Sequence, residues 1–173
     1  MQNDGGKVAV AIPAWNSEAF LARAIDSALA QDYEPKEIWV VDDGSTDGTA
    51  EVARRYGDRV RYTRQENAGP DVARNRVIFE SDAEYVAFLD ADDEWLPGRL
   101  SQCLAPMEGD PSVGLTWCRS IRRFPDGCEM TYGESIVRNS PYPFDPFPLP
   151  LQSTPATTGR RGAPVIGNRV DIG

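Results

Sequence analysis

The sequence contains no histidine among its 173 residues. Histidine is the commonest general base near neutral pH and the usual partner of catalytic serine and cysteine nucleophiles. Its absence excludes Ser-His and Cys-His catalytic pairs and leaves proton transfer to carboxylates. Cys103, Cys118 and Cys128 have no Cys-x-x-Cys spacing, and without histidine they complete no zinc set. We expect these cysteines to be reduced, partly buried thiols.

Long apolar runs are also missing. The nearest, residues 8–12, is far shorter than the roughly 20 residues that span a bilayer, and no basic-then-apolar leader opens the chain. We therefore expect no transmembrane segment and a cytoplasmic protein, or one that is peripheral to the inner face of the membrane. With 18 Lys and Arg against 27 Asp and Glu, the net charge of -9 repels phosphate backbones, which argues against a nucleic-acid partner.

Short β-branched or aromatic runs alternate with helix-like segments along the chain. Strands are predicted at residues 8–12, 38–41, 60–62, 85–89 and 113–117. Helices are predicted at 20–29, from Ser45 or Thr46 to about residue 56, at 71–79 and from about Pro97, with Asn16 or Ser17 capping the first. This order predicts an α/β fold with a Rossmann-like, mixed but mostly parallel sheet and helices on both faces.

The chain divides into three predicted parts. Residues 1–6 form a flexible N-terminus, 7–135 a single domain, and 136–173 an irregular tail that is rich in proline. Residues 122–127 contain Arg-Arg and Pro-Asp-Gly and are typical of a hairpin turn.

An acidic cluster follows the predicted strand 85–89. Asp90 and Asp92 can project to one side of a strand end, where crowded carboxylates suit Mg²⁺ or Mn²⁺ shared with substrate phosphates. The alternative is a solvated acidic turn at the start of a helix, with Asp93 and Glu94 in its first turn. A calcium loop of the EF-hand type is excluded, because Trp95 stands where its glycine is required.

Two further segments carry candidate binding residues. Asp42 and Asp43 end another apolar strand, where carboxylates accept hydrogen bonds from a base or ribose, and residues 45–47 are expected to cap the next helix. Arg74 follows a glycine turn on a predicted helix and suits a planar base or a phosphate, with a surface ion pair as the alternative. Neither G-x-G-x-x-G nor G-x-x-x-x-G-K-[ST] occurs, which weighs against a dinucleotide or P-loop site.

Four segments taken together, Val-Ala-Val-Ala-Ile-Pro-Ala-Trp-Asn from residue 8, Val-Asp-Asp-Gly-Ser-Thr-Asp-Gly-Thr from residue 41, Asn-Ala-Gly from residue 67 with Ala-Arg-Asn from residue 73, and Leu-Asp-Ala-Asp-Asp from residue 89, resemble family 2 glycosyltransferases. The resemblance covers residues 7 to about 118. It implies a GT-A fold that binds a nucleoside-diphosphate sugar, most simply a UDP-sugar, with Mn²⁺ or Mg²⁺.

The resemblance also implies roles for individual residues. The nucleotide-sugar contacts would be Pro13 and Ala14 in the base pocket, Asp42 or Asp43 on the base, Arg74 on the nucleotide and Asp90 near ribose and diphosphate. Asp92 would bind the metal. The expected reaction is inverting transfer of the sugar to an acceptor hydroxyl on a saccharide or lipid-linked molecule.

The catalytic base of that family is an acidic residue well after the D-x-D strand, and we expect it beyond Gly173. Asp171 is a poor candidate, and Asp126, Glu129 or Glu134 are the remaining substitutes within the chain. The alternative function is a truncated donor-binding module without transfer activity. A third interpretation, an aspartyl phosphatase with Asp90 as nucleophile and Asp92 as acid, ranks below both.

Overall fold

The computed structural model describes residues 6–118, 120–123, 128–132, 135–138 and 165–166. Its helices are α1 (Leu21–Leu29), α2 (Thr49–Arg54), α3 (Pro70–Glu80) and α4 (Arg99–Gly109), with one short 3-10 turn at Gly57–Arg59. Its strands are β1 (Val8–Ala14), β2 (Lys36–Asp42), β3 (Arg61–Arg64), β4 (Tyr85–Phe88), β5 (Val113–Trp117), β6 (Ser120–Arg123), β7 (Glu129–Tyr132), β8 (Ser135–Arg138) and β9 (Val165–Ile166).

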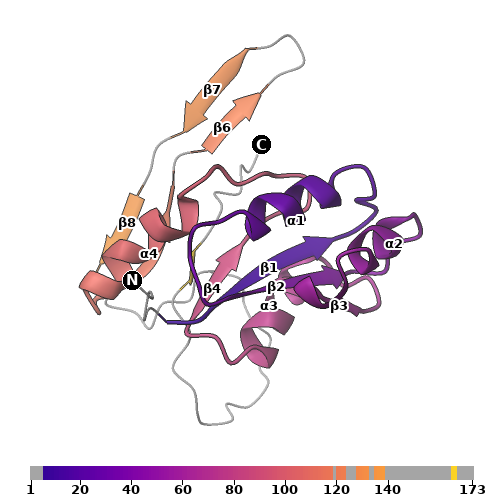
Figure 1. Cartoon of the computed structure of the whole chain (residues 1–173), viewed down its shortest axis with the longest axis horizontal. Coiled ribbons are helices and arrows are strands. Elements are labelled where there is room, and N and C mark those ends of the chain that lie inside the picture. Colours follow the sequence, from indigo (N-terminus) through magenta and orange to yellow (C-terminus); the bar gives the residue numbers. More distant parts are fainter. Residues whose placement is uncertain (1–5, 119, 124–127, 133–134, 139–164, 167–173) are drawn as a thin grey trace.

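Seven of these strands form one sheet in the order β3-β2-β1-β4-β9-β5-β8 (Figure 1). All neighbouring pairs are parallel except β5 and β8, which are antiparallel. The predicted α/β fold with a mixed, mostly parallel sheet is therefore confirmed.

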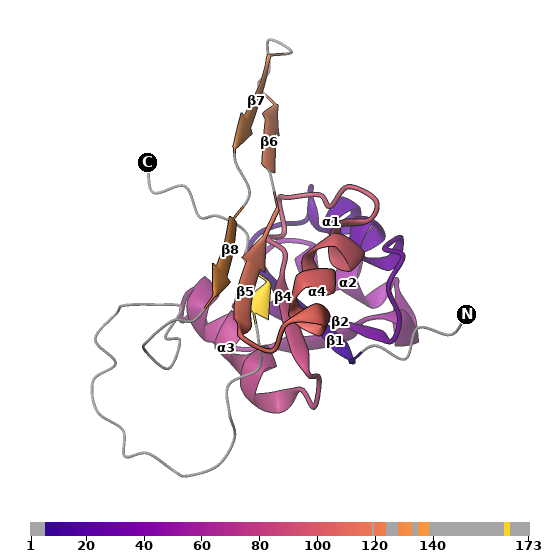
Figure 2. The same cartoon turned by 90° about the vertical axis from the view of Figure 1, so that its left-hand side faces the viewer.

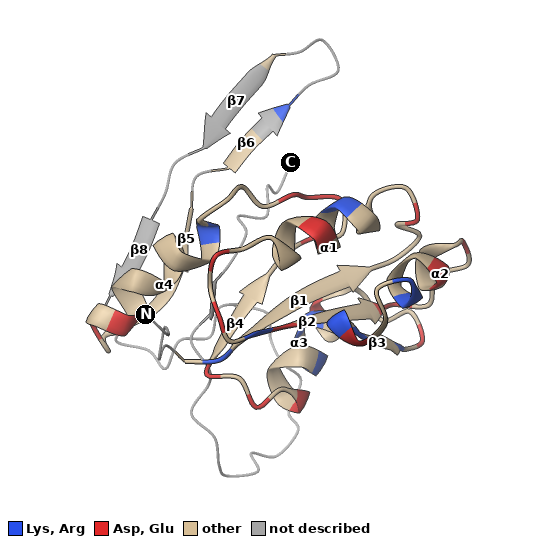
Figure 3. Ribbon diagram, in the orientation of Figure 1, with Lys and Arg blue, Asp and Glu red and all other residues tan. Residues whose placement is uncertain are grey.

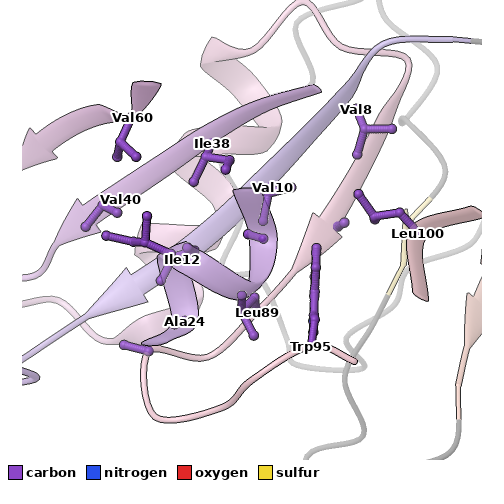
Figure 4. Packing of buried hydrophobic residues seen from close by; sticks show 14 of the residues in the cluster. Val8, Val10, Ile12, Ala24, Ile38, Val40, Val60, Leu89, Trp95 and Leu100 are labelled. Atoms are coloured by element: carbon purple, nitrogen blue, oxygen red, sulfur yellow. The ribbon is translucent and has the colours of Figure 1, made fainter. Parts of the chain in front are cut away.

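Helices cover both faces of this sheet, with α1, α2 and α4 on one face and α3 on the other (Figure 2). Alternate residues of β1 feed two separate cores. Val8, Val10 and Ile12 pack against α1, α2 and α4 (Figure 4), whereas Ala9 and Ala11 pack toward α3. Because β1 is buried along its whole length, its sequence is a continuous apolar run without polar alternation.

The predicted caps of α1 are wrong, and α2 begins at Thr49 and not at Ser45 or Thr46. Of residues 45–47, which were expected to cap α2, Asp47 accepts the Thr49 N–H at 3.0 Å. The first helix is flanked by Phe20 and the second by Gly48, and neither flanking residue makes a side-chain capping hydrogen bond. Asn16 and Ser45, two of the predicted caps, instead bind each other's loops across the site, as described below. A polar side chain that has a long-range partner is no longer available to cap its own helix.

Two strands lie within the range predicted to be an irregular tail. β8 pairs with β5, and the short β9 is inserted between β4 and β5. The β9 residues Val165 and Ile166 are β-branched, which favours a strand at this position. The predicted hairpin is present as the antiparallel pair β6 and β7, while residues 124–127 of its turn lie outside the described residues.

The cysteines differ in their exposure. Cys103 is buried and Cys118 partly buried, but Cys128 is exposed, so the expectation of three partly buried thiols is wrong for Cys128. Within the described ranges, every helix is too short or too polar to cross a membrane.

Candidate functional site

The carboxyl ends of four parallel strands meet at one edge of the sheet. Ala14 at the end of β1 is level with Asp42 of β2, and Asp42 is level with Arg64 at the end of β3. On the other side of β1, the Leu89 N–H donates to the Ala11 carbonyl 3.1 Å away, which carries β4 on toward Asp90. The register therefore brings the two acidic segments predicted from the sequence to neighbouring strand ends.

Asp42 is fully buried at this edge, and its carboxylate is occupied by protein donors. Oδ1 accepts the Ser45 N–H at 2.8 Å, and Oδ2 accepts the Tyr62 hydroxyl at 2.7 Å with Arg64 Nη1 3.5 Å away. Burial, together with the hydrogen bond to Asp42, raises the pKa of Tyr62 above its ordinary value. Asp42 thus holds the turn after β2 through its hydrogen bond from the Ser45 N–H.

Asp43 is 3% exposed and organises the segment that precedes α3. Its Oδ1 accepts the Gln65 side-chain amide at 2.8 Å and the Ala68 N–H at 3.0 Å, and its Oδ2 accepts the Gly69 N–H at 2.8 Å. The Asp43 N–H itself donates to the Ala14 carbonyl at 2.8 Å. Of the two adjacent acids, Asp43 is the one that links β1 and β2 to the start of α3.

The loop after β1 is joined to the loop after β2 by reciprocal hydrogen bonds. Asn16, at φ 48°, donates its N–H to Ser45 Oγ at 3.0 Å and accepts the Thr46 N–H on its side chain at 2.9 Å. Two residues on, the Glu18 N–H donates to Asp47 at 3.1 Å while Glu18 Oε2 accepts the Gly48 N–H at 3.0 Å. These exchanges hold the two loops at a fixed separation along one side of the site.

Arg74 connects α3 to the acidic segment after β4. It is 8% exposed, and it donates through Nη1 to Asp71 at 2.8 Å and through Nη2 to Asp90 at 2.5 Å. Asp90 keeps 32% of its side chain exposed. The structure therefore brings two of the predicted site residues, Arg74 and Asp90, into direct contact. The alternative for Arg74 was a surface ion pair, but the arginine of this pair is largely buried.

Asp92 lies on the turn closed by the hydrogen bond from the Asp93 N–H to the Asp90 carbonyl, at 3.0 Å. Its side chain is exposed, and in the described part of the chain it has no hydrogen-bond or ion-pair partner. Figure 3 shows the acidic stretch on the loop between β4 and α4 in red. Within the described residues no three His, Cys, Asp or Glu side chains gather as a complete metal site.

Pro13 and Ala14 are buried at the end of β1, so they contribute the floor of this edge rather than an open surface. The next residue, Trp15, is 59% exposed and presents an indole ring beside them. Sequence reasoning did not single out Trp15, although an aromatic residue directly after a buried strand is a signal for it. Tyr62 and Gln65 were also missed, because nothing local in the sequence ties them to Asp42 and Asp43.

The residues weighed as catalytic base cannot be placed at the site. Asp126, Glu134 and Asp171 lie outside the described residues, and Glu129 belongs to β7 without a described side chain.

The comparisons with known proteins agree with this arrangement. The profile of glycosyl transferase family 2 matches residues 9–161. The chain belongs to glycosyltransferase family 2. This family 2 chain is 35% identical over 138 residues to the uncharacterized glycosyltransferase YibD of Escherichia coli strain K12. The match covers 78% of the chain and 38% of YibD. The chain thus spans well under half the length of that relative.

Solved glycosyltransferase structures resemble the family 2 chain in fold. TarS of S. aureus, residues 1–349 in complex with UDP, superposes with a TM-score of 0.60 at 29% identity, over 66% of this chain and 36% of that fragment. The mannosyltransferase PcManGT of Pyrobaculum calidifontis, in complex with GDP-Man and Mn²⁺, superposes with a TM-score of 0.62 at 28% identity, over 69% of this chain and 37% of PcManGT. These neighbours share the GT-A fold that the sequence motifs implied.

Proposed function

We propose that the protein transfers a sugar from a nucleoside-diphosphate sugar, with UDP as the nucleotide, to an acceptor hydroxyl with inversion at the anomeric carbon. The observation that carries this proposal is the shared sheet edge: Trp15 and Asp43 directly follow β1 and β2, the Arg74–Asp90 pair lies after β4, and the exposed Asp92 stands on the turn that follows. TarS and PcManGT, which bind UDP and GDP-Man respectively, support a nucleotide-linked donor.

The nucleotide would lie along the carboxyl ends of β1 and β2. The exposed Trp15 ring offers a face for a planar base, and aromatic rings favour stacking of this kind. Pro13 and Ala14 would form the floor of the base pocket. We assign Asp43 to the base, because Asp42 is fully buried, with Tyr62 and Arg64 at its Oδ2, whereas Asp43 retains 3% exposure and its Oδ2 accepts a single hydrogen bond.

Arg74 and Asp90 would lie on the ribose and diphosphate side. The guanidinium has further N–H groups beyond the two used on Asp71 and Asp90, and these suit phosphate oxygens. Holding Asp90 by an ion pair fixes the direction in which its second oxygen can accept a ribose hydroxyl. The pair therefore acts as a preformed support for the donor.

Asp92 fits a divalent cation of the Mg²⁺ or Mn²⁺ type. Its hard carboxylate oxygens are exposed and without a protein partner in the described residues, in contrast to Asp90. Such cations are commonly held by one or two carboxylates together with substrate phosphates, so a single protein ligand is sufficient here. When bound, the cation would supply positive charge against the departing diphosphate.

The transfer itself would be one displacement. A carboxylate takes the proton of the acceptor hydroxyl, the oxygen attacks the anomeric carbon, and the bond to the diphosphate breaks on the opposite face. We assign proton removal to an acidic residue, as the resemblance to the family implies. The acceptor would be a saccharide or a lipid-linked molecule.

The test is calorimetric titration of the chain with UDP, with and without MnCl₂, alongside thermal unfolding. A ligand at one hundred times its Kd stabilises the native state by about 2.7 kcal/mol, so Tm should rise by several degrees. Asp92→Asn should lose the manganese-dependent part of the affinity. Glu94→Gln, an exposed acid on the same loop, removes the same charge and should keep it.

Two results would contradict the donor site: no binding of UDP or GDP with any divalent cation, or equal losses in Asp92→Asn and Glu94→Gln. Release of UDP from a UDP-sugar in the presence of acceptor separates transfer from the alternative of donor binding alone. Binding without release would support the donor-binding module.

A further inference from the structure

Two thiols face each other on the side of the sheet that α4 covers, and neither belongs to the residues assigned to the donor. Cys103 lies in the second turn of α4 and Cys118 directly follows β5. Their sulfur atoms are in direct contact, 2.8 Å apart, and either thiol can be the donor. The two residues are 15 positions apart in the sequence, so the contact is made by the packing of α4 on β5 and not by a local turn.

Neighbouring groups hold this pair in place. The Thr116 hydroxyl donates to the Cys103 carbonyl at 2.9 Å, which fixes β5 against α4 next to the sulfurs. Arg99, one helical turn before Cys103, stacks on the Trp95 ring with its guanidinium carbon 4.7 Å from the ring centroid. Its positive charge acts on both sulfurs. For Cys103 this charge favours the thiolate, the reactive form, but it is outweighed by burial and by the contact with Cys118.

The two cysteines are not equivalent. Cys103 is buried, and the hydrogen bond with Cys118 together with burial raises its pKa well above the ordinary value of a thiol. Cys118 is partly exposed. An oxidant from solvent therefore meets Cys118 first, and Cys103 is placed to react second.

We infer that Cys103 and Cys118 form an oxidative modification site, in which a hydroperoxide converts the two thiols into a disulfide that joins α4 to the end of β5. The Cys118 thiolate attacks one peroxide oxygen, which gives a sulfenic acid and releases the other oxygen as water. Cys103 then loses its proton and attacks the Cys118 sulfur, and the hydroxyl leaves with that proton as a second water. Two thiols are oxidised and one hydrogen peroxide is reduced to two waters.

The geometry requires little rearrangement for this bond. A disulfide has a sulfur separation of about 2.05 Å, so the two sulfurs must approach by less than about 1 Å. The cross-link would restrict the unfolded chain, and oxidised protein should therefore unfold at a Tm several degrees above that of reduced protein.

The experiment treats the full chain with hydrogen peroxide and counts free thiols after denaturation. We expect three thiols before treatment and one after it, because only Cys128 should remain. Trypsin alone leaves Cys103 and Cys118 on one peptide, residues 100–119, whereas added cleavage after Glu108 places them on two peptides. The two resulting peptides should stay joined until reduction, with a combined mass lower by two hydrogen atoms.

Two cysteine variants provide a second test. In Cys103→Ser, Cys118 should accumulate as sulfenic acid and be labelled by dimedone, whereas the wild-type chain should show little label. Cys128→Ser is the matched control, since it removes an exposed thiol and should leave the cross-link unchanged. Three free thiols after treatment, or a cross-link that includes Cys128, would overturn the assignment.

Discussion

Arg74 of α3 donates to Asp90, 16 residues further along the chain, and thereby joins the helix on one face of the sheet to the end of β4. The arginine is almost fully buried, while Asp90 remains partly open to solvent. A buried cation that faces a partly open carboxylate sets the position of that carboxylate without removing it from the surface. This relationship explains how one acidic residue of a crowded cluster is kept in a defined orientation.

Replacing Arg74 by alanine should destabilise the protein by about 1 to 3 kcal/mol, because Asp90 and Asp71 lose a charged donor in a partly buried setting. The matched control is Arg76→Ala on the same helix, whose ion pair with Glu80 is more exposed. That change should cost less than about 1 kcal/mol. Urea unfolding of both variants measures the difference, and equal losses would show that the Arg74–Asp90 pair contributes nothing particular.

Asp43→Asn should destabilise the protein by about 1 to 3 kcal/mol. All three groups around the Asp43 carboxylate are donors, so the introduced amide nitrogen has no acceptor there. Asp58→Asn, at an exposed position in the 3-10 turn, is the matched control and should be close to neutral. Chemical denaturation of the two variants provides the comparison; a neutral Asp43→Asn would mean that the segment 65–69 does not depend on this carboxylate.

Gly44→Ala should cost more than Gly57→Ala. Both glycines have positive φ, 79° and 55°, where an L-residue loses about 1 to 2 kcal/mol. At Gly44 an added Cβ would also lie 3.0 Å from the Asn67 backbone nitrogen, whereas at Gly57 it meets nothing within 4 Å. Free energies of unfolding separate the two contributions, and identical values would mean that the backbone near Asn67 yields without cost.

Stability at alkaline pH should depend on Tyr56. Burial, together with the hydrogen bond to Asp26, raises the pKa of Tyr56 from 10.0 to about 12. The folded state therefore favours the protonated phenol, and its contribution is complete below pH 10 and lost as the pH rises toward 12. Wild-type protein should lose stability more steeply over this interval than Tyr56→Phe. Parallel slopes in pH-dependent thermal unfolding would contradict the expectation. The other tyrosines are the same in both proteins, so their titration does not cause a difference between the two slopes.

The regular parts of the fold could be predicted from the sequence because their signals are local. The apolar runs of β1 and β2 and the stripe of α1 each reflect a buried face with a fixed period. The cap of α1 and the start of α2 were mispredicted for the opposite reason. Asn16 and Ser45 are good caps in isolation, but each forms its hydrogen bond with a loop some 30 residues away.

The same distinction applies to the candidate site. Acids at strand ends are visible in the sequence, and the prediction that Asp42, Asp43 and Asp90 gather at one edge follows from parallel register. What separates the buried Asp42 from the exposed Asp92 is the presence of Tyr62 and Arg64 on β3, which no local pattern connects to Asp42. The two-residue strand β9 was equally hidden, because its pairing depends entirely on the neighbours β4 and β5.

The exchange of hydrogen bonds between Asn16 and residues 45–46, and between Glu18 and residues 47–48, has a consequence for protein engineering. Each segment supplies both a donor and an acceptor to the other, so neither keeps its shape when its counterpart is replaced. A chimera that imports residues 15–18 from a homologue must import 45–49 from the same source. The local structure of these two loops is therefore transferred as a pair and not one loop at a time.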